Sequence, residues 1–226
     1  LIKLAGKTIV QRLVEEISAS FEEAIDNIGF VVGDFGTEVE EDLIKIAEKL
    51  GANGHIFYQD RPLGTAHAVL CAEKIMTGSC VIAFADTLFK SDFNINKSAD
   101  GTIWVKQIDD PSSFGVVKLD KDIITDFVEK PDVFVSDLAI IGIYHVKDSS
   151  ILKSEIEFLI DNNIKDKGEY QLTNALENMK NKNYKFGASE VQEWLDCGNK
   201  DATCYTNQRV LFHQKNNVDQ TSQIIN

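Results

Sequence analysis

The chain has 226 residues, 43% of them apolar, which is enough for one large α/β domain to bury a core without disulfides or a structural metal. A net charge of −13 argues against nucleic acid as the main partner, although a few local cations or a metal ion could still hold small phosphorylated substrates. With no apolar run of membrane-spanning length, no signal peptide and four cysteines without metal-ligand spacing, we expect a cytoplasmic protein with reduced thiols.

The first part of the chain alternates predicted helices with predicted strands. Apolar residues recur at helical spacing over 9–21, 37–50 and 63–76. Short apolar runs predict buried parallel strands at 28–32, 55–58 and 80–85. Thr8 and Thr37 are the candidate N-caps of the first two helices. This β-α-β-α-β order predicts a Rossmann-like, doubly wound sheet with helices on its faces.

The second part begins with consecutive strands, which predict that the sheet is mixed and has an antiparallel portion. These strands are expected at 101–108, 114–119, 123–128 and 137–146. Helices are expected at 149–162, 171–181 and 200–213, with a strand near 184–190. One domain over 1–213 is therefore expected, followed by a polar linker or the start of a further segment at 214–226.

Gln59 directly follows a predicted strand, at the end where open parallel sheets bind ligands. Gly64 precedes a helix whose free N–H groups could face a polar ligand, and a glycine lets a ligand approach the backbone closely. A Gln amide can match the edge of uracil or thymine, where an N–H lies between two carbonyls. A solvated loop glutamine is the alternative, and spacing alone favours it.

Two acidic residues are candidates for holding a magnesium ion. Asp86 directly follows the third predicted strand, although an aspartate that caps the next turn is equally natural there. Asp196 comes just before a helix that Asn199 could cap. Mg²⁺ is typically held by one or two carboxylates plus substrate phosphates and water, so two converging acids would suffice.

Lys130 lies in the sequence Glu129-Lys130-Pro131, at the end of another predicted strand. A cation at that position could bind a phosphate as a point charge. Because surface lysines before proline are common, this signal is weak by itself.

In order along the chain, these segments resemble the sugar-phosphate nucleotidyltransferases, which include glucose-1-phosphate thymidylyl- and uridylyltransferases. The motifs that carry the resemblance are LIKLAGK (1–7), QDRPLGTAHA (59–68), AFAD (83–86), FGVV (114–117), EKP (129–131), AIIGIY (139–144), GEYQLT (168–173) and WLDCG (194–198). Each motif is weak alone, but eight in the same order leave little room for chance.

The resemblance implies a nucleotide-diphospho-sugar transferase fold and a role for each candidate residue. Gln59, Gly64 and Thr65 would read the base, and Asp86 would contact the nucleotide through the metal. Asp86 and Asp196 would hold Mg²⁺. Gly115, Glu129 and Lys130 would contact the sugar phosphate, with Lys130 joining the two aspartates as a catalytic group. His67, on an apolar helix, is expected to be a packed or hydrogen-bonded structural residue.

The implied reaction joins a nucleoside triphosphate, UTP or dTTP, to a sugar 1-phosphate and releases pyrophosphate, in a protein that could form a homo-oligomer. The family's glycine-rich G-x-G-T-R loop does not occur in the sequence, so we expect the printed chain alone to have little transferase activity. A non-catalytic relative that senses sugar nucleotides or assembles a complex is the alternative. A nicotinamide-dependent dehydrogenase would require G-x-G-x-x-G after the first strand, and the sequence shows none.

Overall fold

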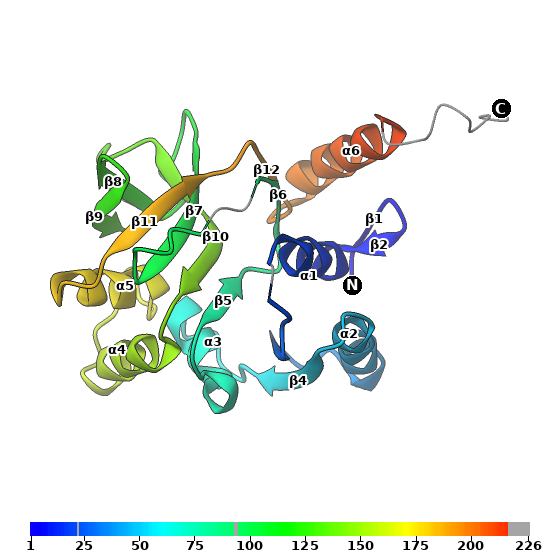
Figure 1. The fold of residues 1–226 in the computed structure, drawn as a ribbon, viewed down its shortest axis with the longest axis horizontal. Helices are drawn as coiled ribbons and strands as arrows, with labels where there is room; N and C mark the ends of the chain where they lie inside the picture. The colour runs from blue at the N-terminus through cyan, green and yellow to red at the C-terminus, as the bar shows by residue number, and fades with distance from the viewer. Residues whose placement is uncertain (22, 93–94, 217–226) are drawn as a thin grey trace, which may run out of the picture.

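The computed structural model describes residues 1–21, 23–92 and 95–216, with side chains up to 214 (Figure 1). Helices in this part are α1 (Ile9–Ser20), α2 (Thr37–Lys49), α3 (Thr65–Cys71), a short 3₁₀ turn η1 (Glu73–Ile75), α4 (Ser149–Asp161), α5 (Leu172–Asn181) and α6 (Lys200–Asn216). Strands are β1 (Lys3–Leu4), β2 (Lys7–Thr8), β3 (Asn27–Val32), β4 (Asn53–Tyr58), β5 (Cys80–Ala83), β6 (Thr87–Lys90), β7 (Gly101–Gln107), β8 (Val116–Asp120), β9 (Ile123–Val128), β10 (Leu138–Val146), β11 (Phe186–Glu190) and β12 (Glu193–Asp196).

The predicted helices are confirmed, except that the one expected at 63–76 is divided into α3 and the 3₁₀ turn η1, and one cap is corrected. Thr8 caps α1, because its hydroxyl accepts a hydrogen bond from Gln11 N at 3.1 Å. Thr37 is not a cap: Gly36 occupies the N-cap position with φ +82°, and Thr37 is already helical. Glycine adopts that φ without a steric penalty, whereas a β-branched residue does not.

A six-stranded mixed sheet forms the centre of the molecule, in the order β5-β10-β7-β11-β9-β8. The predicted antiparallel portion is confirmed by β10, which pairs antiparallel with β5, β7 and β8. Only β7 and β11 pair in parallel within this sheet. The apolar run of β7, at the centre of this sheet, is fully buried, with Ile103 and Trp104 both 0% exposed. Helices α4 and α5 pack against each other beside it (Figure 1).

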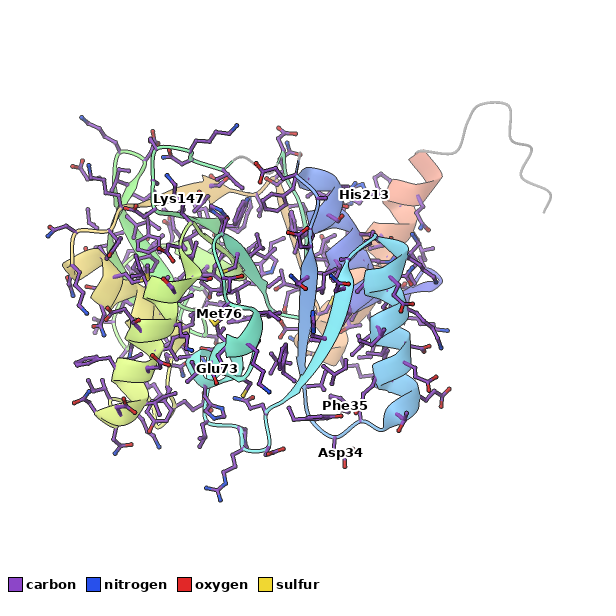
Figure 2. All side chains as sticks on the ribbon, turned by 60° about the horizontal axis from the view of Figure 1, so that its bottom comes forward. Asp34, Phe35, Glu73, Met76, Lys147 and His213 are labelled. Carbon is purple, nitrogen blue, oxygen red and sulfur yellow. The ribbon has the colours of Figure 1, made fainter. Side chains whose placement is uncertain are left out.

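The first strands are not joined into one continuous sheet, contrary to our expectation. β3 and β4 pair in parallel, as predicted, but they form a separate two-stranded sheet covered by α2. β5 instead pairs antiparallel with β10. Within the described residues, β3 and β5 therefore each have one edge without a ladder partner. Figure 2 shows Asp34 and Phe35 beyond the carboxyl end of β3, where Phe35 is 66% exposed.

Two further strand pairs lie outside these two sheets, and the sequence did not predict them. β6 and β12 pair antiparallel, which brings residues more than a hundred positions apart into register. β1 and β2 form a hairpin whose turn has positive φ at both Ala5 and Gly6. Arg12 of α1 fixes this hairpin by donating to the carbonyls of Leu4 and Ala5, each at 2.8 Å.

The last helix, α6, runs to Asn216, three residues beyond its predicted end. Most of the predicted linker at 214–226 lies outside the described residues, so that prediction stays open. Among the helices of the described part, none is both long and apolar enough to cross a membrane.

Candidate active site

The structure brings Asp86 and Asp196 together. Asp86 lies in the short connection from β5 to β6, and Asp196 ends β12. The β6–β12 register pairs Thr87 with Asp196, and the Asp86 carbonyl accepts from Cys197 N at 2.7 Å. A Cβ added to Gly198 would lie 3.4 Å from Asp86 Oδ2 and 3.2 Å from Asp196 Oδ1. The two carboxylates therefore flank one glycine.

Among the residues that the structure describes, neither carboxylate of this pair forms an ion pair with a cationic side chain. Partial burial of the carboxylate raises the pKa of Asp86, and the negative charge of Asp196 raises it further. The Asp196 carboxylate also accepts from Gly198 N at 2.9 Å. A divalent cation between the two would neutralise both charges, so the pair fits Mg²⁺. Within the described part, no group of three or more His, Cys, Asp or Glu side chains could hold a metal. Mg²⁺ bound by two carboxylates usually completes its coordination with substrate oxygens and water.

Gln59 follows β4, as predicted, and its amide already has partners within the protein. Its Nε2 lies 3.0 Å from the Gly64 carbonyl oxygen and 3.1 Å from His67 Nδ1. The expectation that His67 is hydrogen-bonded is therefore confirmed. Gln59 is half-buried, so it is not the solvated loop residue of the alternative interpretation.

Gly64 is needed for the packing of the chain itself. It has φ +115°, and a Cβ there would lie 2.4 Å from the Tyr170 carbonyl oxygen. The space where a side chain on Gly64 would lie is therefore filled by the backbone of Tyr170, just before α5, and not by a ligand. A contact of Gly64 with a nucleotide stays a prediction.

Thr65, the first residue of α3, connects this helix to the start of α5. Its hydroxyl donates to Gln171 Oε1 at 3.1 Å and accepts from Leu172 N at 2.9 Å. Gln171, the N-cap of α5, makes no side-chain cap bond of its own. Thr65 thus caps α5 from a distant part of the sequence, and its role in nucleotide binding stays a prediction.

The predicted sugar-phosphate residues lie together. Glu129 Oε2 accepts from the Thr173 hydroxyl at 2.7 Å, and a Cβ on Gly115 would meet both of these side chains. Burial raises the pKa of Glu129, while the Thr173 hydrogen bond and Lys130 act against that rise. Lys130 is half-exposed, with Nζ 3.9 Å from Glu129 Oε1. The φ of Lys130 is +37°, in the left-handed region, so the chain turns sharply at this residue.

The candidate residues form three groups: the Asp86–Asp196 pair, the segment from Gln59 to Thr65, and the cluster of Gly115, Glu129 and Lys130. Two contacts connect these groups. The segment at 168–173 touches both Gly64, through Tyr170, and Glu129, through Thr173. Phe114 packs edge-on against Trp194 with ring centroids 4.8 Å apart, which joins the segment just before β8, where Gly115 lies, to the strand β12 that ends at Asp196. No hydrogen bond or ion pair among the described residues joins Gln59 directly to Asp86. Sequence reasoning missed the Phe114–Trp194 pair, although both residues lie inside the motifs that carried the resemblance.

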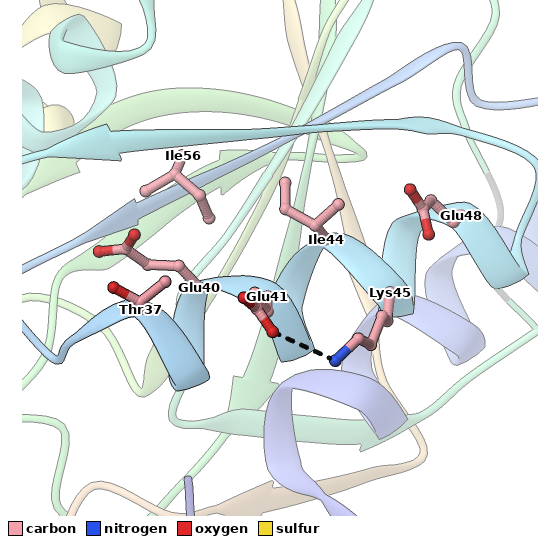
Figure 3. A pocket seen from close by; sticks show the side chains of 7 residues that line it. All are labelled: Thr37, Glu40, Glu41, Ile44, Lys45, Glu48 and Ile56. Atoms are coloured by element: carbon pink, nitrogen blue, oxygen red, sulfur yellow. Dashed lines mark ion pairs between the residues drawn. The ribbon is translucent and has the colours of Figure 1, made fainter.

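A separate hollow of about 370 Å³ lies over α2 and β4 and shares no residue with these groups (Figure 3). Ile44 and Ile56 lie at its base, and its rim carries Glu40, Glu41 and Glu48. Lys45 is the only cation that lines it, and it is paired with Glu41 at 3.7 Å. An acidic rim of this kind repels phosphorylated ligands.

The mixed α/β fold and the clustered acids define a class of protein: the chain belongs to the nucleotidyl transferase family, whose family model matches residues 1–211. Among its curated relatives, the bifunctional protein GlmU of Methanococcus vannielii is 29% identical over 88% of this chain and 46% of its own length. The mannose-1-phosphate guanylyltransferase catalytic subunit beta of Drosophila pseudoobscura is 30% identical over 70% of this chain and 44% of its own. A glucose-1-phosphate thymidylyltransferase of Streptomyces antibioticus is 27% identical over 93% of this chain and 60% of its own. The chain thus spans about half the length of the curated relatives it matches.

Solved structures confirm the fold. A nucleoside-diphosphate-sugar pyrophosphorylase from Vibrio cholerae covers 92% of this chain and 90% of its own, with a TM-score of 0.77 and 17% identity. A putative glucose-1-phosphate thymidylyltransferase from Bacillus anthracis covers 92% and 85%, with a TM-score of 0.75 and 21% identity. The predicted nucleotide-diphospho-sugar transferase fold is therefore confirmed, although the roles of individual residues are not tested at this level of identity.

Proposed function

We propose that the protein transfers a nucleotidyl group from UTP or dTTP to a sugar 1-phosphate and releases pyrophosphate. The observation that carries this proposal is the meeting of Asp86 and Asp196 beside Gly198, because their sequence positions are far apart. The names of the relatives support the class of reaction, since they include a thymidylyltransferase and a guanylyltransferase of sugar 1-phosphates.

The residues of the chain would contribute positioning and charge neutralisation, with no covalent intermediate. When bound between Asp86 and Asp196, Mg²⁺ would stabilise negative charge on the reacting phosphates. Lys130 would neutralise the sugar phosphate, and Glu129, fixed by Thr173, would accept hydrogen bonds from sugar hydroxyls. Gln59 would orient the base. A general base is not required, because the attacking phosphate is already ionised at neutral pH.

The deciding experiment measures pyrophosphate release by the full-length protein. The assay uses Mg²⁺, UTP or dTTP, and glucose 1-phosphate or related sugar phosphates. Asp86→Asn and Asp196→Asn should each remove most turnover and leave the circular dichroism spectrum unchanged, because each keeps the shape of the side chain and removes its charge.

Asp201→Asn is the matched control, since Asp201 is an exposed residue in the first turn of α6. It should leave turnover unchanged. If either site variant keeps near wild-type activity at saturating magnesium, the assignment of the metal ligands is wrong. A folded protein that binds sugar nucleotides without any turnover would instead support the non-catalytic alternative.

A further inference from the structure

The orientation of the Gln59 amide is determined by its neighbours. The Gly64 carbonyl oxygen can only accept a hydrogen bond, so the amide atom 3.0 Å from it must be the nitrogen. The same nitrogen lies 3.1 Å from His67 Nδ1. The two N–H groups of the amide therefore have two partners inside the protein, and Oε1 is the atom left to face a ligand.

This arrangement also determines the tautomer of His67. Because Nδ1 accepts from Gln59, the proton of the neutral ring is carried by Nε2. Cys71 Sγ lies 3.9 Å from the same Nδ1. Burial raises the pKa of Cys71, so this side chain is a thiol and a weak donor. Two donors thus converge on Nδ1.

The Gly64 carbonyl is itself held in place. It also accepts from Ala68 N at 3.1 Å, in the first turn of α3. On its other side, Gly64 packs against the Tyr170 backbone. Both partners that hold the amide of Gln59 therefore belong to the start of α3, and this helix start is itself packed against the backbone before α5.

We propose that His67 is a positioning residue for base selection, which holds Gln59 so that it presents only its oxygen to the nucleobase. This rests on the proposed function, in which Gln59 faces the edge of a pyrimidine. Uracil and thymine carry an N–H at ring position 3, which the oxygen accepts. Cytosine has an unprotonated nitrogen there, so two acceptors would face each other. Without His67, only the Gly64 carbonyl holds the NH₂ group, so turning the amide to present that group to cytosine costs one hydrogen bond fewer.

The test compares kcat/KM for UTP and CTP in the complete protein. His67→Leu removes the acceptor and should lower the preference for UTP over CTP by about tenfold or more, because one orienting hydrogen bond is lost. His67→Asn places an amide oxygen close to the position of Nδ1 and should restore most of the preference. His55→Leu, the control, removes a histidine whose ring bonds Asn27 instead, and should leave the preference unchanged. Once His67 is Leu, adding Gln59→Ala should cost little further preference.

A nuclear magnetic resonance experiment tests the arrangement without any turnover. In ¹⁵N-labelled wild-type protein, the His67 ring should show a protonated Nε2 and an unprotonated Nδ1. A protonated Nδ1 in the neutral ring would overturn the proposal, as would an unchanged UTP preference in a folded and active His67→Leu variant. Absence of transferase activity in the wild type would contradict the proposed function, and the ring tautomer would still decide whether His67 holds Gln59.

Discussion

The amide of Gln59 is the group on which the proposed choice of base depends. Gln59→Ala removes the acceptor that would face the pyrimidine N–H, and should reduce discrimination between UTP and CTP by about 1–3 kcal/mol. Competition assays with both nucleotides in one mixture measure this directly. Gln107→Ala is a suitable control, because Gln107 bonds Asp137 at the end of β7. An unchanged preference in the Gln59 variant would show that another group reads the base.

Lys130 should act on the other substrate. Its amine is half-exposed and lies beside Glu129, so it can neutralise a sugar phosphate without touching the base. Lys130→Ala should raise the KM for the sugar 1-phosphate and leave the KM for the nucleotide nearly unchanged, whereas Lys130→Arg should keep most activity. Lys118→Ala, at an exposed position on β8, is the control. A rise confined to the nucleotide KM would place Lys130 at the wrong end of the site.

At the scale of elements, Thr65 offers a test of how the site is assembled. Its hydroxyl supplies the missing cap of α5 by accepting from Leu172 N. Thr65→Val keeps the shape but loses this acceptor, and should lower the free energy of unfolding by about 1–2 kcal/mol, which is typical of a lost cap. Urea denaturation measures the change. Thr65→Ser retains the hydroxyl and should stay close to wild type, and equal stability of the Val variant would contradict the capping role.

The sequence predicted the elements whose signals are local. α1 was predicted with its cap because Leu13 and Ile17 recur at helical spacing after Thr8. β10 was recognisable in the sequence because nearly all of its residues are apolar, and the structure shows that all but the first of them are buried. Strands β6 and β12 were missed, since each has only four residues and depends on a partner far along the chain. Apolar runs also carry no information about partners, so β3, β4 and β5 were wrongly expected to belong to one continuous sheet.

Part of the candidate site was also predictable, because strand ends and short motifs are local signals in the sequence. Strand ends located Gln59 and Lys130, and motif order paired Asp86 with Asp196. The role of His67 could not be read, because it depends on the geometry of one carbonyl and one amide. The turn between β1 and β2 did leave a signal, since Gly6 favours the positive φ of a two-residue hairpin turn.

At the scale of the whole molecule, the two parallel strands β3 and β4 form a thin layer. Their ladder has two strands, and β3 has one edge without a partner in the described part of the chain. The hydrophobic cluster that they form with α2 has few buried members, namely Phe30, Leu43, Ile46 and Ala47. By contrast, β7 is flanked by β10 and β11, and Ile103 and Trp104 are 0% exposed.

This contrast predicts unequal local stability. Opening β3 and β4 breaks one ladder and exposes a small cluster, whereas opening β7 breaks two ladders inside the main core. Hydrogen exchange should therefore be at least about tenfold faster for the ladder amides of β3 and β4 than for those of β7, equivalent to a difference of about 1.4 kcal/mol in opening free energy. Mass spectrometry of peptides covering 27–32, 53–58 and 101–107 measures it. Equal protection in all three peptides would mean that both sheets unfold as one unit, so that the packing of α1 and α2 around the thin layer stabilises it as firmly as a full sheet.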